Sequence, residues 1–358
     1  MILILTPYSF NPLHPRLEYI EKYLVKNGYE VKKYNLNCKS RVFSKLNWFS
    51  LTFFQIPAFF KSIKILWKHK KETEVVYIQD LQYLHIAILA KFFGKKVIYD
   101  TLDNNVELNF YHLSNRFSIL KKATFIKNII SFLEKKMAKY FCDEVIVNSK
   151  ALVEYFQPLS VNLIYYTSPF EKKIEIDYDK DVAFIYLGGF WKMKGSDLIL
   201  NFIEKHNKKI FIYGMVNSKE NDVLKKMDKL KNKDLVSFVD RLPSRELEIK
   251  LKEIGNNFRI IGFSLTQSVN KSNETQEINK DIDYLAMGIP IIGNYRKPTK
   301  EKIDAGCGVF IDNDANIKKL LDNKKFYQNI LNNCIGYYNQ NYAQNIFEKK
   351  LLKVIEDV

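Results

Sequence analysis

The sequence predicts an α/β protein in which two doubly wound, Rossmann-like halves follow one another along the chain. Short apolar runs bounded by turn residues alternate with longer helical patterns, which indicates parallel strands joined by crossover helices on both faces of a sheet. This alternation restarts near residue 182. A chain of 358 residues with 47% hydrophobic content is long enough to bury two such cores.

The first half opens with an apolar run at 2–6, which we expect to be a buried first strand. The helical patterns at 16–27 and 81–93 are amphipathic, and each ends at a glycine, Gly28 or Gly94, as helix C-termini commonly do. The other strands of this half are predicted at 30–34, 75–79, 96–100 and 144–148.

The second half repeats the pattern, with strands predicted at 182–187, 209–213, 235–239, 258–264 and 289–293. A stretch with a proline and a run of charged residues separates the halves and reads as a linker. The expected limits are an N-terminal domain at 1–166, a linker at 167–180, a C-terminal domain at 181–338, and a last helix at 339–358 that crosses back to the first domain.

Composition narrows the function classes. The formal net charge of +16 suits nucleic acid, an anionic membrane surface or phosphorylated substrates. No nucleic-acid-binding signature accompanies the charge, so we expect no nucleic-acid partner. The apolar N-terminus is too short for a signal peptide. Four cysteines without paired spacing predict a protein of the reducing cytoplasm. Neither a zinc site nor a disulfide framework is indicated by the spacing of Cys38, Cys142, Cys307 and Cys334.

The segment 43–71 combines aromatic residues with lysines. It is too interrupted to span a bilayer, because Pro57 and Lys61 lie within its apolar stretch. One interpretation is an amphipathic helix at an anionic lipid interface, which would make the protein peripheral on the inner membrane. The other is a crossover helix that packs on its own sheet. The aromatic residues are Trp48, Phe49, Phe53, Phe54, Phe59, Phe60 and Trp67.

The run 279–294 predicts a helix with small residues directly before a buried strand. An acid on that helix, Asp283, can accept hydrogen bonds from a ribose diol, as acids do in dinucleotide folds. A second motif, at 187–197, lies after a strand and before a helix. Its glycines, Gly188, Gly189 and Gly195, let the backbone approach a ligand, and the helix start with Lys194 suits phosphate.

These two motifs resemble those of the retaining nucleotide-sugar glycosyltransferases of GT-B fold known as family 4 or group 1. Those enzymes carry a helix similar to Asn-Lys-x-x-Glu-Tyr-x-Ala-x-Gly-x-Pro-Val-Ile, and Asp283 stands where their Glu does. Their earlier sugar-binding acid corresponds to Thr275, which Glu274 and Glu277 flank. Their sugar-diphosphate loop has an arginine where this chain has Gly189, so Lys192 or Lys280 would supply the second charge.

The resemblance implies two Rossmann-like domains facing a cleft, with the nucleotide-sugar on the second and the acceptor on the first. It implies retention of configuration without a protein nucleophile, a metal or any other cofactor. The residues implied in donor binding are Gly188, Gly189, Lys192, Lys194, Gly195, Glu274, Glu277, Lys280 and Asp283.

In the first half, polar residues follow the predicted strand ends, where ligands bind in such sheets. We expect His14 and Asp103 to act in catalysis together with Lys194, although residues at these turns also cap helices. If the enzyme inverts instead, Asp103 or Asp100 must act as the general base toward the acceptor hydroxyl.

The predicted function is transfer of a sugar, in the hexosyltransferase class, to a glycan or lipid-linked acceptor in bacterial surface polysaccharide biosynthesis. The departures at Gly189, Thr275 and Asp283 leave open a non-catalytic scaffold that binds a nucleotide or glycan. A third interpretation is a sugar-nucleotide epimerase of similar fold, which would need no acceptor.

Overall fold

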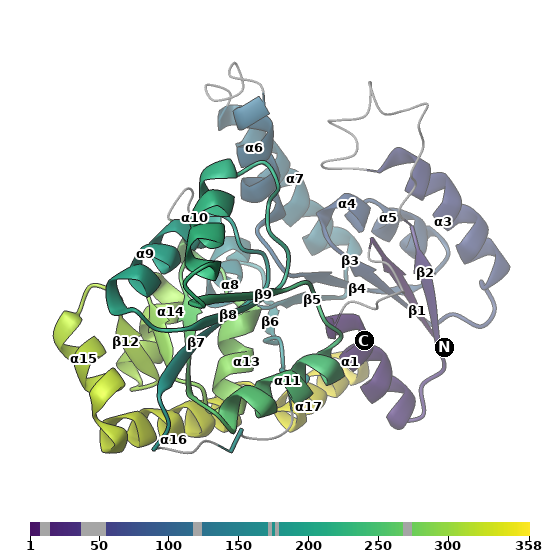
Figure 1. Cartoon of the computed structure of the whole chain (residues 1–358). Helices are drawn as coiled ribbons and strands as arrows, with labels where there is room; N and C mark the ends of the chain where they lie inside the picture. The colour runs from purple at the N-terminus through teal and green to yellow at the C-terminus, as the bar shows by residue number, and fades with distance from the viewer. Residues whose placement is uncertain (8–14, 37–54, 117–123, 171–173, 176–178, 268–273) are drawn as a thin grey trace. The chain divides into compact units, whose positions relative to one another are not determined.

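A computed structural model describes residues 1–7, 15–36, 55–116, 124–170, 174–175, 179–267 and 274–358 (Figure 1). The chain divides into two compact units. The first comprises Met1–Tyr165 together with Asn345–Val358, and the second comprises Tyr166–Gln344. Each unit contains one six-stranded parallel sheet with helices around it.

The first unit has the strand order β2-β1-β3-β4-β5-β6, and all its neighbouring strands pair in parallel. The chain adds β2 on one side of β1 and then adds β3 and the later strands on the other side. The order in which strands are added therefore reverses between β1 and β3. The strands are β1 (Ile2–Thr6), β2 (Val31–Asn35), β3 (Val75–Gln79), β4 (Lys96–Thr101), β5 (Glu144–Val147) and β6 (Asn162–Leu163).

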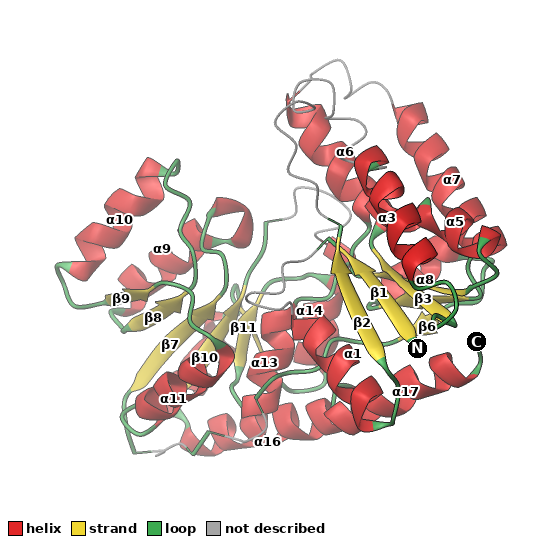
Figure 2. Cartoon of the chain, turned by 90° about the vertical axis from the view of Figure 1, so that its right-hand side faces the viewer, coloured by secondary structure: helices red, strands yellow, loops and turns green. Residues whose placement is uncertain are grey.

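Alternate residues of these strands enter two separate cores, because successive side chains of a strand point to opposite faces. Leu3, Leu5, Val76 and Ile78 pack beneath α3 (Ile56–Lys68), α5 (Ile86–Phe92) and α7 (Thr124–Phe141). Ile2, Ile4, Val75 and Tyr77, which point to the other face, pack on α1 (Pro15–Lys26) and α17 (Gln344–Glu356). Figure 2 shows these two helical layers on opposite sides of the sheet. The other helices of this unit are α4 (Leu81–Leu84), α6 (Asn105–Arg116) and α8 (Lys150–Phe156).

The second unit has the strand order β12-β11-β10-β7-β8-β9. Counted from β7 as the first strand, this is the order 3-2-1-4-5-6 of a dinucleotide-binding Rossmann sheet, read from the β9 edge. The order in which strands are added reverses between β7 and β10. The strands are β7 (Val182–Leu187), β8 (Ile210–Tyr213), β9 (Val236–Val239), β10 (Arg259–Ser264), β11 (Ile291–Gly293) and β12 (Gly308–Phe310).

The helices of the second unit follow the crossover pattern that parallel strands require. A short 3-10 turn, η2 (Lys192–Lys194), precedes the first of them. The helices are α9 (Ser196–His206), α10 (Asn221–Lys231), α11 (Ser244–Gly255), α13 (Asn279–Met287), α14 (Lys297–Asp304), α15 (Asp314–Asp322) and α16 (Lys324–Asn341).

The predicted fold class is confirmed, since both halves are doubly wound parallel sheets. Two details differ from the sequence prediction. The helix expected at 81–93 is divided at His85 into α4 and α5. The strands β6 and β12 were missed because they have only two and three residues. The helix expected at 339–358 is α17, and its buried residues Phe347, Leu351 and Val354 belong to the core that α1 covers.

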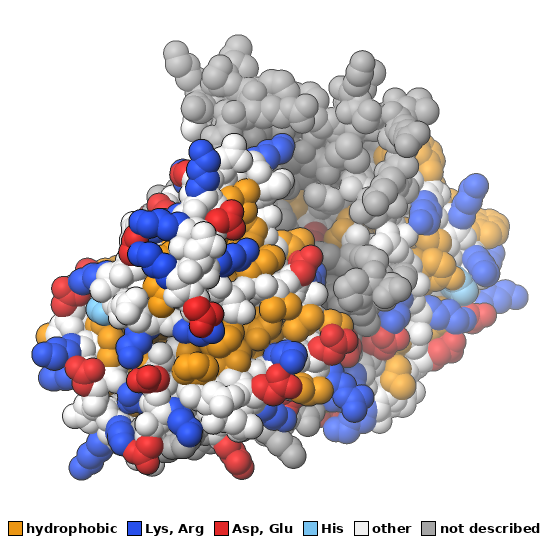
Figure 3. Space-filling model, viewed as in Figure 1, with side chains coloured by type: hydrophobic (Ala, Val, Ile, Leu, Met, Phe, Trp, Pro, Cys, Tyr) orange, Lys and Arg blue, Asp and Glu red, His pale blue; other side chains and the backbone are white. Residues whose placement is uncertain are grey.

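Charge is spread over the surface of the protein. Lysine and arginine side chains alternate with acidic ones across the face shown in Figure 3, particularly over the second unit. Within the described ranges, no helix combines the length and apolar character needed to cross a membrane.

Candidate nucleotide-binding site

The candidate site lies in the second unit, where the chain leaves β7 and β10 at the carboxyl edge of the sheet. Ligands of doubly wound sheets bind at this edge, at the point where the strand order reverses. The loop after β7 carries Gly188 and Gly195, and the loop after β10 begins at Leu265. Both sequence motifs therefore converge on one position of the fold.

Gly195 fits this position because it has no side chain. Its φ of +79° lies in the left-handed region, and a Cβ there would approach Leu265 Cβ to 2.7 Å. Gly195 is also the N-cap of α9, so the free amides of the first helical turn start at this loop. The Gln267 amide donates to the Met193 carbonyl at 3.0 Å, which ties the two loops together.

The first residue of α9, Ser196, is fully buried, and its hydroxyl has no hydrogen-bond partner in the part of the chain that the structure describes. A buried hydroxyl without a partner costs free energy, which a ligand oxygen at this helix start would recover. Together with the helix dipole, Ser196 favours an anion at the N-terminus of α9.

Lys280 is the most unusual cation of the site. It lies in the first turn of α13, only 9% exposed, with its Nζ 3.7 Å from the ring centroid of Tyr186. Among the described residues no carboxylate pairs with this ammonium group. Burial holds the pKa of Lys280 well below its ordinary value, and the positive charges of Lys194 and Arg296 lower it further, against the opposing effect of Asp281.

Arg296 joins the site although the sequence analysis did not select it. Its side chain is 4% exposed, and Nη2 donates to the Gln276 carbonyl at 2.6 Å. Burial lowers the pKa of this guanidinium, and Asp281 and Glu277 raise it. Its position in the sequence could have indicated it, because Arg296 lies in the short loop after β11, at the same carboxyl edge of the sheet.

Three cations, Lys194, Lys280 and Arg296, are thus close enough that two of them depress the pKa of the third. Like charges are gathered in a partly buried place at a cost in free energy, which a bound anion of more than one charge would offset. This arrangement can hold a diphosphate, with the backbone amides of α9 as additional donors.

Asp283 lies three residues after Lys280, on the same side of α13. Its Oδ1 accepts a hydrogen bond from the Ser168 hydroxyl at 2.8 Å. Burial raises the pKa of the carboxyl to about 7, and nearby Asp281 adds to this effect while the Ser168 hydrogen bond opposes it. The partner Ser168 comes from the segment between the two sheets, which the sequence analysis treated only as a linker.

The raised pKa of Asp283 predicts a pH-dependent stability. Its ordinary value is 3.8 and its folded value is about 7, so the folded state keeps a proton that the unfolded state has lost between these values. The free energy of unfolding should therefore fall as pH rises through this window. Chemical denaturation at a series of pH values should show a shallower fall in Asp283→Asn. The exposed control Asp240→Asn should keep the wild-type slope, and an identical slope in Asp283→Asn would contradict the assignment.

Several residues implied by the resemblance are engaged elsewhere. Lys192 is exposed and forms an ion pair with Asp222 of α10, which raises the pKa of the lysine through their hydrogen bond. Glu277 is buried in an ion pair with Lys302, and its other oxygen accepts from the Tyr342 hydroxyl at 3.4 Å. These contacts hold the segment before α13 to α14 and to the C-terminal end of α16.

Two further positions are explained by packing or exposure. A Cβ at Gly189 would overlap the ring of Trp191, so the absence of a side chain there allows the indole to cover the loop. Glu274 is exposed at the edge of the described chain. The candidate site therefore consists of Gly188, Lys194, Gly195, Ser196, Lys280, Asp283 and Arg296.

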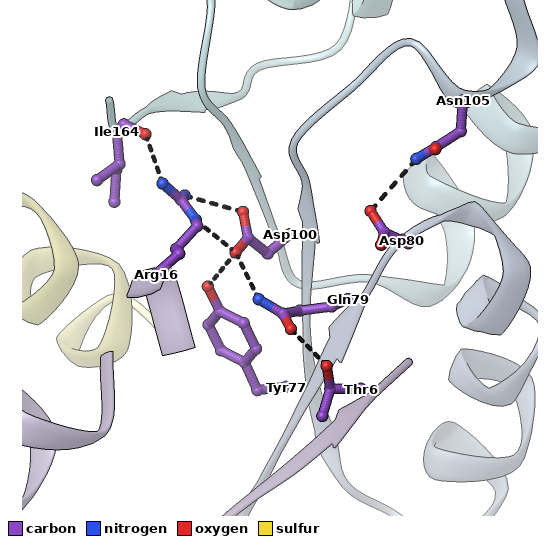
Figure 4. A network of polar contacts seen from close by, with 8 residues as sticks. All are labelled: Thr6, Arg16, Tyr77, Gln79, Asp80, Asp100, Asn105 and Ile164. Atoms are coloured by element: carbon purple, nitrogen blue, oxygen red, sulfur yellow. Dashed lines mark hydrogen bonds and ion pairs between the residues drawn. The ribbon is translucent and has the colours of Figure 1, made fainter. Parts of the chain in front are cut away.

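In the first unit, Asp100 is the centre of a buried network rather than an exposed acid (Figure 4). Arg16 donates to both of its carboxylate oxygens, at 2.8 and 2.9 Å, and to the Ile164 carbonyl at 3.1 Å. The Tyr77 hydroxyl donates to Asp100 at 2.8 Å, and the Gln79 amide does so at 3.4 Å. With these donors and no exposure, Asp100 holds β4 to α1 and is unsuited to deprotonate an acceptor.

The other first-unit candidates lie near the carboxyl edge. Asp103 is half-buried between β4 and α6, and its carbonyl accepts from the Thr101 hydroxyl and the Asn105 amide. Asp80, directly after β3, has a φ of +66°, a strained backbone for a residue other than glycine, and accepts from the Asn105 side chain at 3.3 Å. His14 lies outside the described residues.

The residues 43–54 likewise lie outside the described part of the chain. The rest of the aromatic segment forms α3, which buries Ala58, Ile65 and Leu66 against its own sheet and leaves Phe60 and Trp67 exposed. Over the ranges described, no group of three or more His, Cys, Asp or Glu side chains is arranged to hold a metal ion.

Two parallel doubly wound sheets of Rossmann type, carried by one chain, define the GT-B class of fold. Comparison with solved structures agrees with this class. No protein-family model and no curated protein sequence matches the chain.

The chain is similar to an α,α-trehalose-phosphate synthase (UDP-forming) from Burkholderia xenovorans, with a TM-score of 0.64 at 9% identity, covering 99% of this chain and 100% of that one. It is similar to the lipopolysaccharide outer core galactosyltransferase WaaB, with a TM-score of 0.54 at 12% identity, covering 98% of this chain and 94% of that one. A UDP-N-acetylglucosamine 2-epimerase aligns with a TM-score of 0.51 at 10% identity over 99% and 94%. At sequence identities this low, the structural similarity shows a shared fold and nothing more specific.

Proposed function

We propose that the chain is a nucleotide-sugar-dependent glycosyltransferase whose second unit binds the donor diphosphate. The observation that carries this proposal is Lys280, a buried ammonium group without a carboxylate partner in the described chain, beside the charges of Lys194 and Arg296. A diphosphate supplies the missing negative charge at the edge where Rossmann sheets bind their ligands. Asp283 then accepts hydrogen bonds from the ribose diol.

The same cations serve the chemical step. As the bond between the sugar and the diphosphate breaks, negative charge grows on the leaving phosphate, and Lys194, Lys280 and the α9 amides stabilise it. The sugar ring meanwhile gains oxocarbenium character. We propose retention of configuration, on the resemblance of the two motifs to retaining enzymes. In the inverting alternative Asp103 is the candidate base, since Asp100 is occupied by Arg16.

The acceptor is proposed to be a glycan or lipid-linked sugar of bacterial surface polysaccharide biosynthesis, bound by the first unit near Asp103 and His14. Two rivals share the fold. A non-catalytic scaffold would bind a nucleotide without releasing sugar, and an epimerase would interconvert nucleotide sugars without an acceptor. The similarity to glycosyltransferases and to an epimerase supports both enzyme classes only at the level of fold.

Calorimetric titration with UDP, GDP, CMP and ADP tests the proposed site. We expect one nucleoside diphosphate to bind selectively and Lys194→Ala to weaken its binding about thirtyfold, since a hydrogen bond to a charged group contributes about 2 kcal/mol. The matched control is Lys192→Ala, whose side chain is paired with Asp222 and should leave binding within about twofold.

A second measurement separates the three functions. Slow release of free sugar from the bound donor is expected of a transferase, whereas appearance of an epimeric nucleotide sugar would favour the epimerase. Binding with neither product would favour the scaffold. Failure of all four nucleotides to bind would refute the donor site itself.

A further inference from the structure

The outer surface of three neighbouring helices in the first unit, α3, α5 and α7, is rich in exposed apolar side chains. Helix α5 packs between α3 and α7. The buried residues of all three helices belong to one core cluster on one face of the sheet. Their exposed residues therefore share the opposite, outward side, which Figure 2 shows as the layer farthest from α1 and α17.

Helix α7 carries the clearest stripe. Phe125, Ile129, Phe132, Lys136 and Tyr140 follow one another at intervals of three or four residues, so they lie along one side of the helix. The side chains of Phe125, Phe132 and Tyr140 are 63%, 58% and 61% exposed. A contiguous row of exposed aromatic residues is costly in water and marks a surface that meets a partner.

Lysines are interleaved with these rings. Lys136 Nζ lies 5.3 Å from the ring centroid of Phe132 and 5.4 Å from that of Tyr140, and Lys139 Nζ lies 5.7 Å from the latter. The single acid in the sequence of α7 is Glu134, which is 2% exposed and accepts hydrogen bonds from two tyrosines. The outward side of α7 is thus aromatic and cationic, without an exposed carboxylate of its own.

The same character continues over α5 and α3. Phe92 is 86% exposed and contacts Phe93, which packs edge-on against Trp67 at 6.2 Å between ring centroids. Trp67 is itself 63% exposed, and Lys70 Nζ lies 4.3 Å from its ring. The sequences of α3 and α5 contain no acidic residue. We call this surface the aromatic–lysine face. Its exposed residues are Phe60, Lys64, Trp67, Ile88, Phe92, Phe125, Ile129, Phe132, Leu133, Lys136, Lys139 and Tyr140.

We propose that the aromatic–lysine face docks on an anionic lipid surface. Lysines with long apolar stems and aromatic rings are the residues that lie at a membrane interface, where rings enter the boundary of the acyl chains and ammonium groups meet anionic headgroups. The absence of acidic residues from α3 and α5, and the burial of the one in α7, complement a negative surface. This inference does not depend on sugar transfer, since it concerns a helical layer of the first unit.

Co-sedimentation of the full chain with lipid vesicles tests the proposal. The chain should bind vesicles of phosphatidylcholine and phosphatidylglycerol, bind pure phosphatidylcholine weakly, and dissociate with added salt. The double variant Lys136→Gln/Lys139→Gln should lose about twenty-five-fold in affinity, since each lysine near an anionic surface contributes about fivefold. A second variant, Phe125→Ser/Phe132→Ser/Tyr140→Ser, should lose binding through its rings.

The controls use exposed residues of the second unit, Ile249→Ser on α11 and Lys225→Gln on α10, which should leave vesicle binding unchanged. Because the substituted α7 side chains are exposed, circular dichroism and thermal unfolding should remain close to wild type. The proposal would be overturned if the wild-type protein failed to bind anionic vesicles, or if the α7 variants bound them as tightly as the wild type. So would an α7-dependent dimer without vesicle binding, which would make the face a self-association surface.

Discussion

Replacing Lys280 by methionine is expected to weaken nucleotide binding and, at the same time, to stabilise the unliganded protein. The methionine fills a similar volume over Tyr186 and removes a buried charge that forms no ion pair with a described carboxylate. Exchange of a buried charge for an apolar side chain can raise stability by about 1 to 4 kcal/mol. Loss of one charged contact to the diphosphate should weaken binding about thirtyfold and turnover by about a hundredfold or more.

Lys302→Met is the matched control, because Lys302 is also buried but has partners. Glu277 and Asp281 lie within ion-pair distance and, against the opposing effect of burial, raise the pKa of Lys302. Its removal leaves a buried carboxylate unpaired, which typically costs about 3 to 5 kcal/mol. Denaturant unfolding and calorimetry of both variants should therefore move stability in opposite directions. A destabilised Lys280→Met with intact nucleotide binding would show that Lys280 is a structural lysine.

This contrast also shows what the sequence could and could not predict at the site. Lys194, Gly195 and Lys280 could be selected as candidates because glycines at a strand end and a helix before a strand are local patterns. Glu277 was predicted to bind the donor, and its pairing with Lys302 could not be seen in the sequence because Lys302 comes 25 residues later, on α14. Arg296 was missed for the same reason, as its approach to Lys280 depends on the order of β10 and β11 in the sheet.

At the level of the fold, the prediction succeeded where strands are long and buried. The bounds of β1, β3 and β7 agree with the predicted ranges because each is an uninterrupted apolar run between turn residues. β6 and β12 are too short for such a run. The pattern at 81–93 reads as one helix since its apolar spacing continues across His85, where the chain nevertheless starts a second helix.

Asp100→Asn is expected to cost about 3 to 5 kcal/mol of unfolding free energy, the largest stability effect predicted for the first unit. The substitution leaves the guanidinium of Arg16, only 2% exposed, without its carboxylate. The control is Glu348→Gln, which removes the exposed pair with Lys26 and should change stability by less than about 1 kcal/mol.

The double variant Arg16→Met/Asp100→Asn separates structure from chemistry. Removing both charges should recover part of the stability lost in Asp100→Asn, since the uncompensated guanidinium is gone. Turnover should follow the folded fraction, because Asp100 is fully buried and both of its oxygens accept from Arg16, with Tyr77 and Gln79 as further donors. If Asp100→Asn were as stable as wild type but inactive, Asp100 would be the base of an inverting enzyme and the Arg16 contact would be incidental. Denaturation curves and initial rates on the same preparations decide between these outcomes.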